Sequence, residues 1–281
     1  GKDGFFCEYM EIPQKNDDNA LEMYTLQCRN HILKPLAEKY GIDTSDEAIR
    51  AAVEQHNEVC RLIRAIGDFR KEANPRVTGY EFHILTLVSY VAPKHLIVDK
   101  LRETLEEIKT REPDAADKYR ARVVFVGSEV DDVDVIRLVE ESGAYVCADR
   151  FCYGSLPGRD EILLNDDEDV VKQVCRQVQG RAQCPRYWDM AKMTGRRDYV
   201  ADLAKEYGAD GIIYEQMKFC DYWDPWAYER MIGTIVLRDE HGYPVLAVDR
   251  PYSIGSSGQM RTRVQAFVES IEIKKIQGGK K

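Results

Sequence analysis

The sequence of 281 residues has eight cysteines, yet no two of them stand in C-x-x-C spacing. A zinc site made by this chain alone is therefore not expected, because such sites usually begin with a closely spaced cysteine pair. The sequence also lacks an apolar run near the roughly 18 residues that a membrane span requires. Residues 1–7 contain no hydrophobic core of a signal peptide. We expect a cytoplasmic protein without membrane contact, whose cysteines are buried hydrophobes, reactive thiols or metal ligands.

Positive charge is also in deficit, with 40 Lys and Arg against 49 Asp and Glu and a net charge of −9. Nucleic acids bind through basic fields, so the charge balance argues against a nucleic-acid partner. The phosphate-binding patterns G-x-x-x-x-G-K-[ST] and G-x-G-x-x-G after the first predicted strand are both absent, so we expect no nucleotide bound by this chain. Five histidines without a Ser/His/Asp arrangement give little support for a triad hydrolase.

The composition, 44% hydrophobic and 32% charged, is typical of a globular protein. Residues 1–118 show the three-to-four apolar spacing of helices, and residues 16–18 and 44–47 supply helix N-caps. Helices are predicted at residues 20–36, 48–66, 80–91 and 96–109.

Two positions interrupt the first of these helices. Pro35 is predicted to kink it or split it into two, and Gly41 to end it. Cys28 and Cys60 lie on the apolar stripes of their helices, so we expect both to be core residues.

From Arg122 onward, short β-branched runs alternate with helical periodicity. Strands are predicted at 123–127, 144–147, 211–214 and 245–248, with helices at 133–142, 197–207, 225–237 and 258–273. Strands that are apolar on both faces predict a parallel sheet covered on both sides. We therefore predict an open α/β domain of Rossmann or flavodoxin type over residues 119–281, preceded by a helical segment over residues 1–118. The stretch before residue 197 is expected to be irregular, with Cys175 and Cys184 flanking a linker.

Function in such a sheet collects in the loops beyond the carboxyl ends of the strands. Cys220 lies just after the third predicted strand, in the turn expected to open the next helix. The helix dipole and Lys218 would favour a thiolate there, which suits a nucleophile or a metal ligand. The alternative is a small side chain tucked under a turn. Cys152 follows the second strand in an aromatic-rich loop, and the same alternatives apply to it.

The loop before the last predicted helix contains a Ser-x-x-Gln pattern, formed by Ser256, Ser257, Gly258 and Gln259. This pattern fits a capping box, which starts a helix without any functional role. A Gly- and Ser-rich loop at a helix N-terminus would equally cradle an anion or another ligand, with Arg261 and Arg263 adding positive charge. The residues leave both interpretations open.

Three of these regions resemble motifs of the 2-hydroxyacyl-CoA dehydratase / benzoyl-CoA reductase family. They are residues 148–152 (ADRFC), residues 210–221 (DGIIYEQMKFCD) and residues 244–267, which open with PVLAVD and close with GQMRTRVQAF. The resemblance implies a [4Fe–4S] cluster that receives a low-potential electron from a partner ATPase. It also implies that a ketyl or aryl radical forms on a CoA thioester.

The resemblance implies roles for single residues as well. Cys220 matches a cluster ligand, with Cys152 as a second candidate. The loop of Ser256, Ser257, Gly258 and Gln259 would lie over the cluster or the thioester and hydrogen-bond the thioester oxygen or a cluster sulfur. Proton donors are expected among Tyr153, Tyr214 and Glu215. The implied partners are a homologous second iron–sulfur subunit, ATPase activator subunits with their own [4Fe–4S] cluster, and ferredoxin as electron source.

One departure from the family pattern concerns the first part of the chain. Family members resemble two α/β domains in tandem, whereas no strand–helix alternation precedes Arg122 here, so we expect an N-terminal domain and its cluster cysteines to be missing. Residues 175–188 and 268–277 favour a reductase subunit, an oxidoreductase, over a dehydratase subunit, a lyase. A cluster-free scaffold that binds a partner through its helical half is the alternative from another class.

Overall fold

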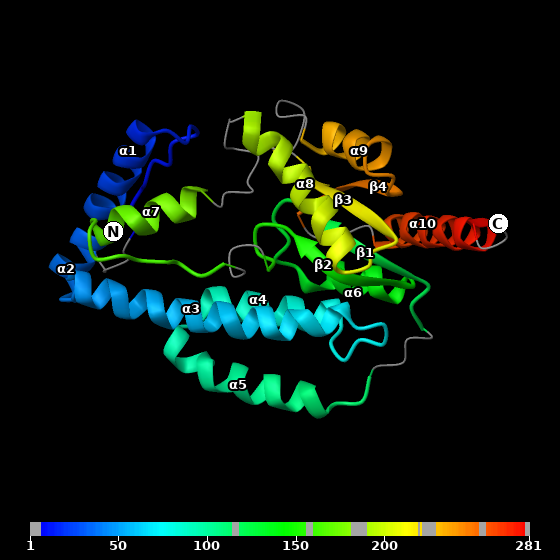
Figure 1. Ribbon diagram of the computed structural model, residues 1–281, viewed down its shortest axis with the longest axis horizontal. Coiled ribbons are helices and arrows are strands. Elements are labelled where there is room, and N and C mark those ends of the chain that lie inside the picture. The colour runs from blue at the N-terminus through cyan, green and yellow to red at the C-terminus, as the bar shows by residue number, and fades with distance from the viewer. Residues whose placement is uncertain are drawn as a thin grey trace.

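The computed structural model describes residues 7–113, 118–155, 160–180, 190–218, 220, 229–252 and 257–278, without the side chains of 190–194, 229 and 257. A layer of helices lies against a four-stranded α/β unit, and the two chain ends lie at opposite ends of the molecule (Figure 1). None of the described helices is long and apolar enough to cross a bilayer.

The first predicted helix is interrupted one turn before Pro35, as the proline led us to expect. Helix α1 (Asp18–Cys28) runs into a π-helical turn (Arg29–Leu33) and then into α2 (Lys34–Tyr40). Proline has no N–H for the regular i→i−4 bond and crowds the preceding turn, and the π-helical turn absorbs this misfit. Gly41 ends α2 in the left-handed conformation, with φ of 65°.

Three longer helices build the rest of the helical layer: α3 (Asp46–Asp68), α4 (Gly79–Val91) and α5 (Lys94–Thr110). Ser45 caps α3, and Thr78 caps α4 in a capping box with Glu81. Their shared core contains Val59, Ile63, Ile66, Val77, Phe82, Ile97, Leu101 and Ile108. The helices predicted from apolar spacing are confirmed.

The sheet contains β1 (Ala121–Val126), β2 (Ala144–Arg150), β3 (Gly211–Met217) and β4 (Val245–Arg250), all parallel, in the order β2-β1-β3-β4. The predicted open parallel sheet is confirmed. Strands β2 and β3 run farther than predicted, through charged residues that form buried ion pairs. Because the chain proceeds from β1 outward in both directions, the topological switch point lies between β1 and β3.

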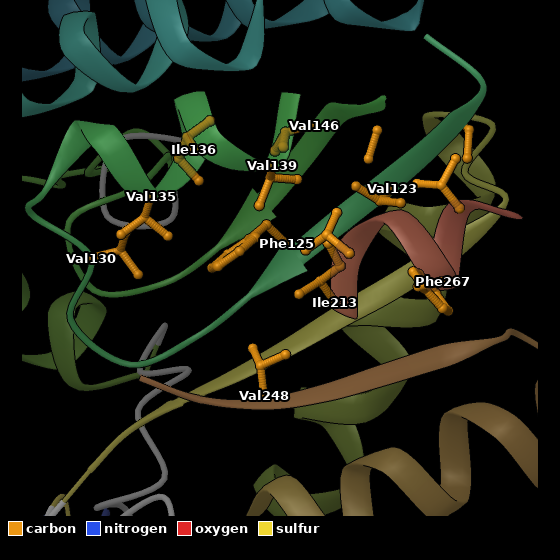
Figure 2. Close-up of a cluster of buried hydrophobic side chains, with 14 of the residues drawn as sticks. Val123, Phe125, Val130, Val135, Ile136, Val139, Val146, Ile213, Val248 and Phe267 are labelled. Atoms are coloured by element: carbon orange, nitrogen blue, oxygen red, sulfur yellow. The ribbon is translucent and has the colours of Figure 1, made fainter. Parts of the chain in front are cut away.

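Helices cover both faces of the sheet, as predicted. On one face, α6 (Val133–Glu141) and α10 (Ser257–Gly278) enclose a core that includes Val123, Phe125 and Ile213 of the strands (Figure 2). On the other face, α8 (Met190–Glu206) and α9 (Glu229–Asp239) pack over Val124, Val126 and Ile212. Burial on both faces fixes the register of each strand.

The stretch predicted as an irregular linker contains helix α7 (Val170–Gly180), so that part of the prediction was wrong. After β2 the chain returns to the helical layer, where α7 lies beside α1 (Figure 1). Val171 and Cys175 pack against Leu21 and Tyr24 of α1, so the apolar face of α7 is buried against the first helix. The domain division at residues 118 and 119 stays a prediction. Cys184 lies outside the described residues.

A buried carboxylate joins the helical layer to the α/β unit. Glu140 of α6 accepts hydrogen bonds from the backbone N–H groups of Gly79 (2.8 Å), Tyr80 (3.1 Å) and Val146 (3.3 Å). Burial raises the pKa of Glu140 from 4.5 to about 7, against the lowering effect of these N–H donors.

This raised pKa predicts a pH dependence of stability. Between pH 4.5 and 7 the native state keeps a proton that the unfolded state releases, so the free energy of unfolding falls as pH rises through this window. The loss attributable to Glu140 is about 3 kcal/mol. Urea unfolding from pH 4.5 to 8, with Glu140→Gln as the non-titrating comparison, measures it. A wild-type-minus-variant difference that does not change with pH would contradict the prediction.

Candidate functional site at the carboxyl edge

The carboxyl ends of the four strands form one edge of the sheet, which we call the carboxyl edge. A buried glutamate carboxylate lies at its centre, at the switch point. Glu215 of β3 accepts hydrogen bonds from the backbone N–H (3.0 Å) and hydroxyl (3.2 Å) of Ser128, which follows β1. The Ser128 hydroxyl oxygen in turn accepts from the Met217 N–H at 3.0 Å. A Cβ at Gly127 would lie 2.6 Å from the Glu215 carboxylate, so only glycine leaves room for this approach. The loop after β1 is therefore tied to the end of β3.

An arginine neutralises this carboxylate and extends the connection to β4. The Arg250 Nε donates to Glu215 Oε1 at 3.0 Å, and the two side chains are 2% and 0% exposed. The same guanidinium donates to the carbonyl oxygens of Glu129, Pro251 and Tyr252. Burial raises the pKa of Glu215, while the Arg250 charge and the Ser128 hydrogen bonds act in the opposite direction. We refer to Ser128, Glu215 and Arg250 as the edge network.

A second buried ion pair fixes the loop after β2. The Arg70 guanidinium, which stacks 3.6 Å from the Phe82 ring centroid, donates to Asp149 Oδ1 at 3.0 Å. Asp149 Oδ2 accepts from the Ser155 N–H at 2.6 Å. Both partners of this pair are almost fully buried. The pair therefore orders the loop that carries Cys152.

The two predicted edge cysteines are both held by backbone hydrogen bonds next to the edge network. The Cys152 N–H donates to the Ser128 carbonyl at 3.0 Å, and the Cys220 N–H donates to the Met217 carbonyl at 3.2 Å. Both side chains are half-buried, and Cys220 packs against the core under α8 and α9. Helix α9 is described from Glu229 onward, so the helix-opening turn expected after Cys220 lies outside the described residues. The structure places one cysteine-bearing loop after β2 and the other after β3.

The predicted proton donors occupy three different environments. Glu215 lies in the edge network, whereas Tyr214 points to the opposite face of β3 and is 1% exposed. A Cβ at Gly233 of α9 would lie 2.9 Å from the Tyr214 hydroxyl, which shows how closely this ring packs against the helix. Tyr153 is 41% exposed and packs edge-on against Tyr90. The structure therefore does not bring these side chains together.

The predicted thioester loop is described only in part. Ser256 and the Ser257 side chain lie outside the described residues, and α10 begins at Ser257. The carbonyl of Gly258 accepts from the Thr262 hydroxyl inside the helix at 3.0 Å. Gln259 lines a small pocket together with Val248, Asp249, Arg250, Pro251, Met260 and Arg263. The capping and ligand interpretations of this loop both stay predictions.

The two arginines expected to add positive charge beside this loop, Arg261 and Arg263, both contact other groups. The Arg261 guanidinium pairs with Glu141 of α6 at 2.8 Å. The Arg263 guanidinium donates to the backbone carbonyl of Ala247. Arg250, which sequence reasoning did not single out, is the arginine that reaches the centre of the edge.

The described residues contain no group of three His, Cys, Asp or Glu side chains arranged to hold a metal ion. A [4Fe–4S] cluster bound by protein thiolates needs Cys ligands from four positions, and this edge offers Cys152 and Cys220. These two thiols fit part of a cluster's ligand set and do not complete it.

An open parallel sheet with polar, cysteine-bearing loops at its carboxyl edge defines an α/β protein of the class whose ligands and cofactors usually bind at the switch point. Residues 3–271 match the family model described as 2-hydroxyglutaryl-CoA dehydratase, D-component, and the chain belongs to this family. The resemblance found in the sequence motifs is thereby confirmed.

Curated relatives include both dehydratase and reductase subunits. The (R)-phenyllactyl-CoA dehydratase beta subunit of Clostridium sporogenes is 25% identical over 92% of this chain and 67% of the relative. A benzoyl-CoA reductase subunit of Thauera aromatica is 23% identical over 96% of this chain and 68% of the relative. The (R)-2-hydroxyglutaryl-CoA dehydratase subunit beta of Acidaminococcus fermentans is 23% identical, covering 96% and 70%. At this similarity the chain is related to subunits of CoA-thioester enzymes of both types.

Proposed function

We propose that this chain is the iron–sulfur subunit of an ATP-dependent, ferredoxin-driven reductase of aromatic acyl-CoA thioesters, of the benzoyl-CoA reductase type. The observation that carries the proposal is that Cys152 and Cys220 lie at one edge of the sheet, on the loops after β2 and β3 that flank β1, each held by a backbone hydrogen bond beside the edge network. The family, together with the benzoyl-CoA reductase subunit among the relatives, supports the same assignment. A cysteine at the carboxyl edge is well placed to meet both a cofactor and a substrate.

In this proposal Cys220, and with it Cys152, would hold a [4Fe–4S] cluster together with cysteines from elsewhere. Such a cluster supplies single electrons of low potential. Glu215 and Arg250 hold the loops in place, and Ser257, Gly258 and Gln259 are candidates for binding the thioester. The exposed phenol of Tyr153 is the proposed proton donor nearest to solvent. The proposed partners are a homologous iron–sulfur subunit, ATPase activator subunits with a [4Fe–4S] cluster, and ferredoxin.

A radical 2-hydroxyacyl-CoA dehydratase is the second candidate, favoured by the dehydratase beta subunits among the relatives. A dehydratase must remove a β-proton and a hydroxyl group, whereas a reductase must deliver protons to an aromatic ring. Both candidate functions would use the cysteines of the carboxyl edge, and they differ in the chemistry done on the substrate.

Turnover by the complex, isolated anaerobically with its activator ATPase, ATP and a strong reductant, tests the proposal. Reduction of benzoyl-CoA without dehydration of 2-hydroxyacyl-CoA is the expected result. Dehydration alone would replace the reductase with the second candidate. If the complex is colourless and lacks acid-labile sulfide after separation from its activator ATPase, the chain is a cluster-free scaffold and both candidates are overturned.

A further inference from the structure

Three sulfur atoms meet where α1 packs against α7. Cys28 ends α1, and its Sγ lies 3.5 Å from the Sγ of Cys175 in α7 and 3.9 Å from the Sδ of Met10. Leu21, Tyr24 and Val171 surround the contact in the core between the two helices. A thioether cannot form a disulfide, so Cys28 and Cys175 are the pair that can become linked.

The two thiols are unequal in exposure and acidity. Cys28 is half-buried and faces the boundary of the core, whereas Cys175 is 2% exposed. The Cys175 thiol donates a hydrogen bond to Cys28, which lowers the pKa of Cys28 and raises the pKa of Cys175. The more reachable sulfur is thus also the one that forms a thiolate more readily, and thiolates are the attacking species in disulfide exchange.

We propose that Cys28 and Cys175 form a reversible disulfide that covalently joins α1 to α7 when the protein meets a low-molecular-weight disulfide such as oxidised glutathione. The Cys28 thiolate attacks one glutathione sulfur, forming a mixed disulfide and releasing the first glutathione thiolate, which takes up a proton. Cys175 then loses its proton and attacks the Cys28 sulfur, releasing the second glutathione. The two cysteines lose two electrons and two protons, and one oxidised glutathione becomes two reduced molecules.

The packing of α1 against α7 holds the two sulfur atoms close to bonding distance. A disulfide bond is about 2.05 Å long, so the sulfurs need to approach by about 1.5 Å. Both cysteines are held in helices. The segment before α7 is fixed to α3 by paired hydrogen bonds between the Asn57 side chain and the Ile162 backbone, at 2.7 and 2.8 Å. The link would therefore form without a large movement of either helix, and would tie the start of the chain to the segment that follows the Cys152 loop.

Titration of the reduced full-length chain with oxidised glutathione tests the proposal. After acid quenching and alkylation of remaining thiols, peptide mapping of the wild type is expected to show one crosslink, joining the Cys28 and Cys175 peptides. Cys175→Ser should instead accumulate a stable glutathione adduct on Cys28. Cys28→Ser should show neither product at Cys175, because the buried thiol cannot attack first. Cys60→Ser changes a buried cysteine of α3 in the same way and should keep the crosslink.

The wild-type measurement decides the proposal without reference to whether a variant folds. A persistent mixed disulfide on Cys28 would show that Cys175 does not resolve it and would overturn the proposal. Alkylation of both cysteines after oxidation, or a crosslink between another pair, would overturn it equally. The experiment needs no cofactor, partner or substrate, so its outcome is independent of the proposed enzymatic function.

Discussion

Replacing Arg250 with methionine is expected to lower the free energy of unfolding by about 3–5 kcal/mol, the usual cost of removing one partner from a buried ion pair. The substitution strands the Glu215 carboxylate, which is 0% exposed, and deprives three loop carbonyls of a donor. Urea unfolding at neutral pH measures the change.

Arg261→Met is the matched control for this prediction. Arg261 pairs with Glu141 at a similar distance, but the two side chains are 40% and 52% exposed. Exposed pairs contribute about 1 kcal/mol or less, so the control should unfold nearly as the wild type does. Equal losses in Arg250→Met and Arg261→Met would mean that the edge network does not stabilise the fold in the way its burial implies.

Cys220→Ser is expected to remove the share of iron and acid-labile sulfide that this chain's cluster contributes to the anaerobically isolated complex, and with it nearly all turnover. The reason is chemical: cluster iron is held by thiolate sulfur, and a serine hydroxyl does not replace it well. Brown absorbance, iron content and sulfide content are the direct measurements. Cys152→Ser is expected to act in the same direction.

Cys60→Ser provides the comparison for the cysteine variants. Cys60 is a buried residue of α3, and its Sγ is 3.3 Å from His56 Nε2. This variant should keep full iron content and turnover. Full cluster content in Cys220→Ser would remove Cys220 from the ligand set, whatever the enzyme's substrate.

The sheet and its edge could be predicted from sequence because burial on both faces leaves a local signature. Runs such as Val123 to Val126 are apolar throughout, and parallel strands place the loops that follow them at one edge. That rule selected Cys152 and Cys220, and the family resemblance added Glu215. What it could not give was the partner of each charge, since Arg250 and Glu215 are brought together by strand pairing and Arg70 and Asp149 by packing of the helical layer.

Helix α7 was missed for a related reason. Its apolar residues, Val170, Val171, Val174, Cys175 and Val178, do recur at helical spacing, but the partner that buries Val171 and Cys175 is α1, far away in the sequence. Cys175 was predicted to flank a linker, although its surroundings are those of a core residue facing another thiol. Tertiary packing decided both the helix and the surroundings of this cysteine.

The hydrogen bonds that join the loops of all four strands determine how the carboxyl edge opens. Ser128 holds the loop after β1 to the loop after β2 and to β3, and Arg250 adds β4, so no single loop can detach without breaking hydrogen bonds of its neighbours. The edge should therefore fluctuate as one cooperative unit, with the amide protons of Ser128, Cys152 and Met217 exchanging with solvent through a common opening event.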